Sequence, residues 1–159
     1  PPPPPPPPPP NFFFKQKTAY ELVRSRGLGD VYKRQAPGIG LAANQVGILK
    51  RLIVMDCSTD DEDPNLIKMI NPEIIFSSTE ISELEEGCLS IPEHKSIVKR
   101  PSNIKVKFLN IEGLEEIIDA EGLLSACIQH EIDHLNGVLF VDHISRLKRD
   151  IILRKVKKP

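Results

Sequence analysis

The stretch LLSACIQHEIDHLNG, residues 123–137, has the periodicity of an α-helix and contains the strongest chemical signal in the chain. Four of its side chains recur at spacings of four, three and four residues, at Leu123, Cys127, His130 and His134. Side chains at these spacings lie on one face of a helix. The Asn-Gly pair that closes the stretch is a common helix terminator. The sequence therefore predicts a helix with two histidines on the same face.

His130, Glu131 and His134 form an H-E-x-x-H motif on this predicted helix. Residues four apart on a helix have Cβ atoms about 5–6 Å apart, so two imidazoles can reach one metal ion. Glu131 would then lie beside a water molecule on that ion, where a general base must act. The alternative is that the two histidines are unrelated helix residues and that Glu131 is a solvated carboxylate.

A catalytic metal bound in this way needs a third protein ligand and one open position. The candidates elsewhere in the chain are Cys88, His94, His143, Cys57 and the carboxylates. Cys88 lies in the segment EEGCLSIP, between a glycine and a proline, and a thiolate in a tight turn suits a soft or borderline metal. A buried cysteine is more often a small core side chain, which we expect for Cys57 and Cys127. We expect His94 and His143 to be surface or capping residues.

The rest of the sequence predicts an α+β fold. Short apolar and β-branched runs, separated by turn residues, predict strands within residues 49–57, 66–71, 73–87 and 103–110. In the last of these runs, apolar side chains alternate with lysines, which is typical of a half-buried antiparallel strand. We therefore expect antiparallel strands packed around the central helix that bears the two histidines.

The carboxyl-terminal segment, residues 144–159, predicts a second helix. Leu147, Ile151 and Val156 lie among seven Lys and Arg residues and a single Asp. This pattern is typical of a basic amphipathic helix that packs on the outside of a domain. Its charged face is either a solvated surface or a surface that suits RNA.

Residues 1–35 differ in character from the rest of the chain. The first ten are prolines, and residues 11–35, NFFFKQKTAYELVRSRGLGDVYKRQ, show no sustained apolar period and resemble translated sequencing adapter. We expect residues 1–35 to be a disordered, non-native segment. Residues 36–159 are then one domain, large enough to bury a core of its own.

Charge and cysteine content exclude several classes of protein. Residues 36–159 hold 20 acidic and 15 basic side chains, so the domain as a whole has no electrostatic attraction to nucleic acid or anionic lipid. The chain contains no run of 18 apolar residues, so we expect no membrane span. Three cysteines are an odd number, which argues against a disulfide framework and for a reducing compartment.

Three segments together resemble the signature motifs of one enzyme family. GIGLAANQVG at residues 38–47, EGCLS at 86–90 and QHEIDHLNG at 129–137, in this order, resemble the three motifs of the bacterial peptide deformylases. The resemblance implies a cytoplasmic, monomeric hydrolase that removes the formyl group from the amino-terminal formyl-methionine of newly made polypeptides and releases formate. Members of that family carry an amino-terminal helix before the first motif, and residues 1–35 stand in its place. We therefore expect residues 36–159 to be a deformylase domain without that helix region.

The resemblance assigns roles at the catalytic centre. It implies that Cys88, His130 and His134 bind one divalent metal, usually ferrous iron, with zinc, nickel and cobalt as alternatives. Glu131 matches the catalytic glutamate of the family. Gln45 and the backbone N–H of Leu89 match the groups that stabilise the developing oxyanion.

The resemblance also implies a substrate cleft. The positions that match its lining are Ile39, Gly40, Glu86, Leu123 and Ala126. Lys95 stands where an arginine commonly contacts the substrate, and a lysine keeps the charge of that residue without its bidentate fork.

Two other functions are compatible with the motifs. One is an H-E-x-x-H metallopeptidase that cleaves internal peptide bonds, and the other is an inactive, truncated deformylase-like domain that only binds metal. A formylated tripeptide, tested beside an unformylated one, separates the deformylase from the peptidase. The resemblance further implies that the basic helix over residues 146–158 docks on the ribosome near the exit of the nascent chain.

Overall fold

The computed structural model describes residues 39–59, 61–88 and 90–157, apart from the side chain of Val46. The expected non-native segment, residues 1–35, and Leu89 lie outside the described residues. The elements, in chain order, are β1 (Gly40–Ala42), the 3₁₀ helix η2 (Ala43–Val46), β2 (Leu52–Met55), β3 (Ile67–Ser77), β4 (Ile81–Cys88), β5 (Ile91–Pro101), β6 (Asn103–Leu109), β7 (Glu115–Glu121), α3 (Gly122–Leu135), the 3₁₀ helix η3 (Phe140–His143) and α4 (Arg146–Val156).

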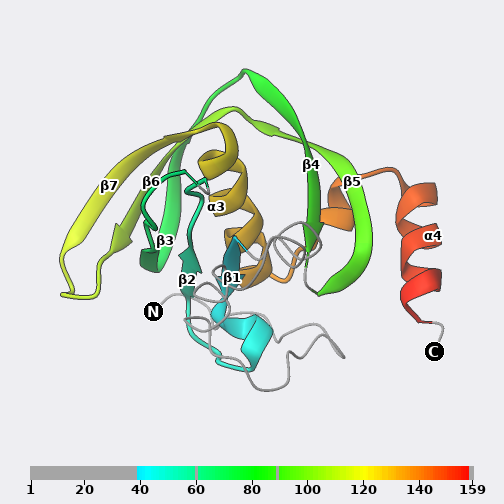
Figure 1. Cartoon of the computed structure of the whole chain (residues 1–159), viewed down its shortest axis with the longest axis horizontal. Coiled ribbons are helices and arrows are strands. Elements are labelled where there is room, and N and C mark those ends of the chain that lie inside the picture. Colours follow the sequence, from blue (N-terminus) through cyan, green and yellow to red (C-terminus); the bar gives the residue numbers. More distant parts are fainter. Residues whose placement is uncertain (1–38, 60, 89, 158–159) are drawn as a thin grey trace.

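The strands form two antiparallel sheets on either side of the helix α3 (Figure 1). One sheet has five strands in the order β1-β2-β3-β6-β7, and the other is the hairpin β4-β5. The hairpin is inserted between β3 and β6, which pair directly with each other. The prediction of antiparallel strands around a central helix is confirmed.

The strand β6 follows the alternation that its sequence predicts. Its apolar residues Ile104, Val106 and Phe108 are buried and face α3. The intervening lysines, Lys105 and Lys107, form ion pairs with acidic residues of neighbouring strands on the other side of the sheet. One face of the five-stranded sheet therefore joins the core.

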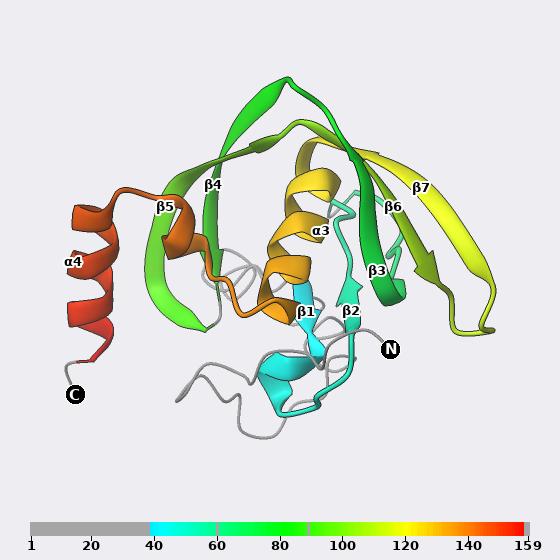
Figure 2. The same ribbon diagram turned by 180° about the vertical axis from the view of Figure 1, so that it is seen from behind.

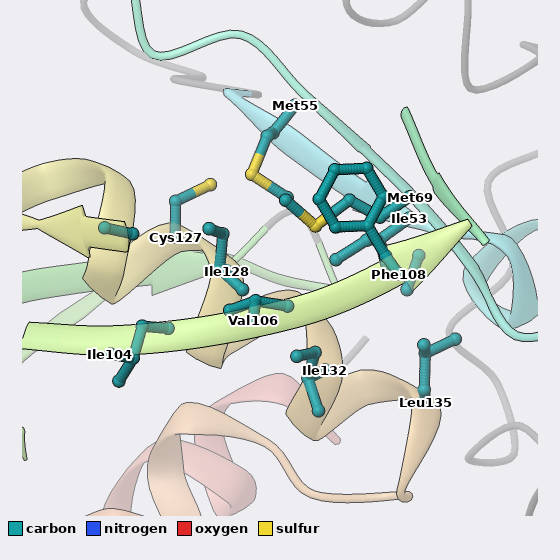
Figure 3. Close-up of a cluster of buried hydrophobic side chains, with 12 residues drawn as sticks. Ile53, Met55, Met69, Ile104, Val106, Phe108, Cys127, Ile128, Ile132 and Leu135 are labelled. Carbon is teal, nitrogen blue, oxygen red and sulfur yellow. The ribbon is translucent and has the colours of Figure 1, made fainter. Parts of the chain in front are cut away.

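The main core lies between α3 and the inner face of this sheet (Figure 3). Ile128, Ile132 and Leu135 of α3 pack against side chains of β2, β3 and β6, among them Met55 and Met69. Each such side chain, once buried, stabilises the fold by about 1.5–3 kcal/mol. The apolar face of α3 thus fixes its position, and with it the position of the two histidines.

One strand boundary differs from the expected runs. The strand β3 continues from Ile67 to Ser77, so it joins the run expected over residues 66–71 to the first part of the run within residues 73–87, and β4 begins at Ile81. The helix α3 begins at Gly122, whose φ of 57° lies in the left-handed region that favours glycine. This residue turns the chain sharply from β7 into the helix.

The carboxyl-terminal helix α4 packs outside β5 (Figure 2), as the sequence predicts, but with a different face. Leu147 and Ile151 were expected on the packed face, yet 71% and 43% of their surfaces are exposed. Ile152 is buried instead, in a second core with Val98 and Phe140. Packing on the apolar side chains of β5 and η3 therefore buries the face of α4 that contains Ile152. None of the helices in the described ranges is long and apolar enough to cross a membrane.

Candidate active site

The helix α3 presents the two histidines of the motif to one point. Their Nε2 atoms are 3.1 Å apart, and the two rings meet edge to face with an interplanar angle of 71°. His134 is buried and His130 is nearly so. This geometry follows from the four-residue spacing and confirms that both side chains lie on one face of the helix.

Cys88, the last residue of β4, brings a thiol to the same point. The hairpin is irregular at Gly87 and Cys88, and this shift places Cys88 opposite Ile91 in a tight connection. Cys88 Sγ lies 3.1 Å from His134 Nε2. The ligand atoms of Cys88, His130 and His134 all lie within 4.8 Å of one another, and no other such group occurs among the residues that the structure describes.

This donor set fits a divalent transition metal. One thiolate and two imidazoles suit iron, zinc, cobalt or nickel, and three protein ligands leave one coordination position open, as a catalytic site requires. The prediction that Cys88 supplies the third donor is consistent with its position. Neither His94 nor His143 joins the group.

Glu86 and Arg100 support His130 from behind. Glu86 Oε2 lies 2.9 Å from His130 Nδ1, which leaves the Nε2 atom of that ring directed at the donor group. Arg100 donates to both oxygens of the same carboxylate, from Nε to Oε1 at 2.5 Å and from Nη2 to Oε2 at 3.0 Å. Its third nitrogen, Nη1, donates to Asp133 at 2.8 Å. A carboxylate behind a histidine ligand fixes the ring orientation and raises its basicity.

The charges of this group depend on one another. Burial disfavours the charged form of Cys88, yet hydrogen bonds with His130 and His134 hold the pKa of its thiol well below the ordinary value. Burial also disfavours the charged form of His130, but hydrogen bonds to Cys88 and Glu86 raise its pKa to about 10. The negative charge that produces this shift also attracts a divalent cation.

Glu131 lies beside the donor group in a buried position. Only 4% of its surface is exposed, and its Oε2 atom is a buried oxygen without a hydrogen-bond partner among the described residues. Burial raises the pKa of this carboxyl group. A carboxylate in this environment takes up a proton more readily than a solvated one, which is what general acid–base chemistry near neutral pH requires.

Gln45 reaches the site from the short helix η2. Its Oε1 atom accepts a hydrogen bond from the Ala42 amide at 2.9 Å, and its Nε2 donates to Ser90 Oγ at the same distance. The Nε2 atom is also 3.7 Å from Cys88 Sγ. The side-chain amide is therefore held with its donor end toward the metal ligands.

A pocket of about 240 Å³ opens onto these residues. All five predicted cleft residues line it: Ile39, Gly40, Glu86, Leu123 and Ala126. The other residues of the lining are Gln45, Leu84, Glu85, Gly87, Cys88, Cys127, His130 and Glu131. Lys95 is not part of this lining. Its ammonium lies 3.9 Å from Glu85, and both side chains are exposed.

The sequence model of the polypeptide deformylase family matches residues 17–150 of the chain. The chain belongs to this family. The match begins within the first 35 residues, so the boundary proposed at residue 35 stays a prediction. Peptide deformylases are metal-dependent hydrolases, and membership favours the deformylase interpretation over the peptidase and the inactive domain.

Individual deformylases agree with this assignment. The peptide deformylase of Rhizobium meliloti is 54% identical over 123 residues, which are 77% of this chain and 71% of the relative. The peptide deformylase of Ehrlichia chaffeensis, solved in complex with actinonin, superposes with a TM-score of 0.75 at 40% identity and covers 87% of this chain and 77% of its own. The enzyme from Synechococcus elongatus, also with actinonin, gives 0.70 at 46% identity, with coverages of 78% and 68%.

Some residues of this deformylase site could not be read from the sequence. Arg100 and Asp133 support the site through ion pairs between elements, and isolated charges of this kind carry no pattern. Asn44 donates from Nδ2 to the carbonyl of His134, which ties η2 to the end of α3. Cys127 was expected only in the core, yet it also lines the pocket.

Proposed function

We propose that this chain hydrolyses the N-formyl group of formyl-methionyl polypeptides and releases formate and a free amino terminus. One observation supports this most directly: a compact Cys-His-His donor set opens onto a pocket beside a buried glutamate and an oriented glutamine amide. The chain belongs to the polypeptide deformylases, and the name of this family states the removal of a formyl group from a polypeptide. The reaction requires a nucleophile at neutral pH, a donor for the oxyanion and a proton carrier for the leaving amine.

Cys88, His130 and His134 would hold one divalent cation. Ferrous iron is our proposal for the native ion, and zinc, nickel and cobalt suit the same donors. Such an ion, when bound, supplies Lewis-acid polarisation and lowers the pKa of the water it binds toward 7. Glu86, which accepts from His130 and is itself held by Arg100, keeps the imidazole in the required orientation.

Gln45 and Glu131 would perform the two remaining tasks. The Nε2 group of Gln45, fixed by Ser90, donates to the oxygen of the formyl group as negative charge develops there. Glu131 accepts a proton from the attacking water and delivers it to the nitrogen of the leaving amine. We propose the backbone N–H of Leu89, which lies outside the described residues, as the second oxyanion donor.

The pocket would hold the methionine side chain. Its walls next to the donor group include Leu84, Leu123 and Ala126, which are apolar and suit a thioether chain. Ile39 and Gly40 line the pocket on the β1 side and Glu86 on the β4 side, and we propose that they position the backbone of the substrate. Lys95, which is exposed outside the pocket, is our proposed contact for more distant parts of the polypeptide.

In the cell, the substrate would be the nascent polypeptide. The enzyme would act on it in the cytoplasm, as a monomer. We propose that α4 docks on the ribosome, because its exposed residues include Arg146, Lys148, Arg154 and Lys155. Neutralising these four residues, while keeping the buried Ile152, should weaken binding to ribosomes and reduce its dependence on salt. Equal binding of the wild-type protein and the neutralised variant to ribosomes at every salt concentration would exclude this role for α4.

The test of the proposed function is release of formate from formyl-Met-Ala-Ser. Protein loaded anaerobically with ferrous iron should release formate from this peptide. It should leave the internal peptide bonds of this peptide and of unformylated Met-Ala-Ser intact. Glu131→Gln, which has nearly the same shape, is the matched control and should bind metal but release no formate above background. A folded, metal-loaded protein that leaves formyl-Met-Ala-Ser unchanged, or that cuts internal peptide bonds, would contradict the proposal.

A further inference from the structure

Two cysteines meet at the wall of the pocket, and neither belongs to the metal-binding group. Cys127 of α3 lines the pocket and is buried, with 5% of its surface exposed. Cys57, two residues after β2, is partly buried and packs against the same core. The two thiols are in hydrogen-bonding contact, and this contact, together with burial, raises the pKa of the Cys127 thiol well above its ordinary value.

The fold brings these cysteines together from separate elements. Ile53 and Met55 point from β2 toward α3, and Met55 shares the buried cluster with Cys127 (Figure 3). Gly40 pairs with Met55 across β1 and β2, and a Cβ atom on Gly40 would lie only 3.0 Å from Cys127 Sγ. Cys127 therefore lies over this end of the two strands, beside the position from which Cys57 emerges.

We propose that Cys57 and Cys127 form an oxidation site at which a peroxide converts the two thiols into a disulfide. The partly exposed Cys57 reacts first: its sulfur attacks one peroxide oxygen, the O–O bond breaks, and a sulfenic acid and one water are formed. The sulfur of Cys127 then attacks the sulfur of Cys57, the S–O bond breaks, and a second water leaves. Two thiols and one hydrogen peroxide thus give one disulfide and two waters.

Closure of this disulfide would change the pocket. A disulfide joins its sulfurs at about 2.05 Å, far closer than two thiols in hydrogen-bonding contact. The Cys127 sulfur must move toward Cys57, and its side chain is part of the pocket wall. The expected result is a several-fold change in KM for formyl-methionyl peptides, with metal retained. This kinetic consequence depends on the proposed function, whereas formation of the disulfide does not.

Peptide mapping of the whole chain tests the site. Zinc-loaded protein is used, because zinc has no redox chemistry of its own and protects Cys88 as a ligand. After treatment with hydrogen peroxide, digestion with trypsin without reductant should give residues 52–68 linked to residues 108–146, at the summed mass less two hydrogens. Dithiothreitol should separate them again.

Two controls make the result decisive. In Cys57→Ser, a nearly isosteric change at a partly buried position whose folding is checked by thermal unfolding, residues 108–146 should remain unlinked after the same treatment. Residues 69–95, which contain Cys88, should be unlinked in both proteins. The proposal is overturned if folded wild-type protein yields no link between Cys57 and Cys127, or if either thiol links instead to Cys88.

Discussion

Glu131 owes its orientation to a glycine that lies against it. A Cβ atom on Gly40 would lie 2.7 Å from Glu131 Oε1 and 2.9 Å from its Cγ. Contacts below 3.0 Å do not persist in folded proteins, so any larger residue at position 40 must displace the carboxylate. Only 4% of the surface of Glu131 is exposed. The absence of a side chain at Gly40 is thus a condition for the position of the proposed proton carrier.

Gly40→Ala should therefore reduce activity without removing the metal. The φ angle of Gly40 is not in the left-handed region, so the backbone accepts alanine, and the effect comes from the contacts of the new methyl group with Glu131 and, less closely, with Cys127 Sγ. A displacement of about 1 Å at a catalytic group costs on the order of 100-fold in rate. Steady-state kinetics, with zinc content and thermal unfolding measured on the same samples, check this. Full activity in the alanine variant would show that Glu131 does not work from its present position.

Gln45→Ala should separate catalysis from metal binding. Because Gln45 lies beside the ligands without being one of them, its loss should leave the metal content near one per chain. Removal of one oxyanion donor costs on the order of 10²–10³ in kcat. Metal analysis and formate release on the same preparation provide the measurement. Joint loss of metal and activity would argue that the glutamine maintains the site rather than stabilising the oxyanion.

At the scale of elements, three segments meet at Arg100. This residue of β5 pairs with Glu86 on the neighbouring strand β4 and with Asp133 on α3, and only 5% of its surface is exposed. Hydrogen bonds to Glu86 and Asp133 raise the pKa of Arg100 against the opposing effect of burial, so the guanidinium stays charged. The hairpin is thereby joined to the helix that carries the histidines.

Arg100→Met should destabilise the fold strongly. Removal of one partner of a buried ion pair leaves uncompensated charge and costs about 3–5 kcal/mol. Lys99→Met is the matched control, because its pair with Glu83 is 3.1 Å long but both side chains are more than half exposed, and such pairs contribute about 1 kcal/mol or less. Urea unfolding of the two variants should show this difference. Equal stabilities would mean that the hairpin is held mainly by its apolar contacts.

The elements also show which parts of the structure a sequence can predict. The helix α3 and the strand β6 were predicted, because periodicity and turn residues are local properties. The prediction of the buried face of α4 was wrong by one residue, because Ile151 and Ile152 are both apolar and only packing on β5 decides which of them is buried. The role of Arg100 was missed, because it depends on which strands lie side by side.

The same principle applies to the site. The pairing of His130 and His134 followed from their spacing, whereas Cys88 remained one of several candidates until a resemblance between whole motifs was considered. Cys88 lies too far from the two histidines along the chain for a local sequence pattern to connect them. Cys57 and Cys127 were both expected in the core, and nothing in their sequence context indicated that they touch.

At the scale of the whole molecule, acid should weaken the fold through Glu86. Burial opposes ionisation of this carboxyl group, yet hydrogen bonds from His130 and Arg100 hold its pKa at about 2, below the ordinary 4.5. Because the folded pKa is the lower one, the charged group stabilises the fold fully above pH 4.5, and this contribution is lost as the pH falls toward 2. Its size is on the order of 3 kcal/mol.

Unfolding of wild type and Glu86→Gln in chelator between pH 7 and pH 2.5 tests this contribution. The wild-type protein should be the more stable of the two at pH 7, and the difference should shrink as the pH falls below 4.5. A difference that stays constant over the whole range would show that Glu86 stabilises the fold through its shape and hydrogen bonds rather than through its charge.

The insertion of the hairpin between β3 and β6 has a consequence for chain entropy. Cys88 comes from the hairpin and His130 from α3, so a cation shared by them closes the loop of chain that separates the two residues, much as a covalent cross-link would. Opening of the hairpin away from α3 then requires release of the cation. Amide hydrogens of β4 and β5 should accordingly exchange with solvent more slowly in the metal-loaded protein, even where they are far from the ligands.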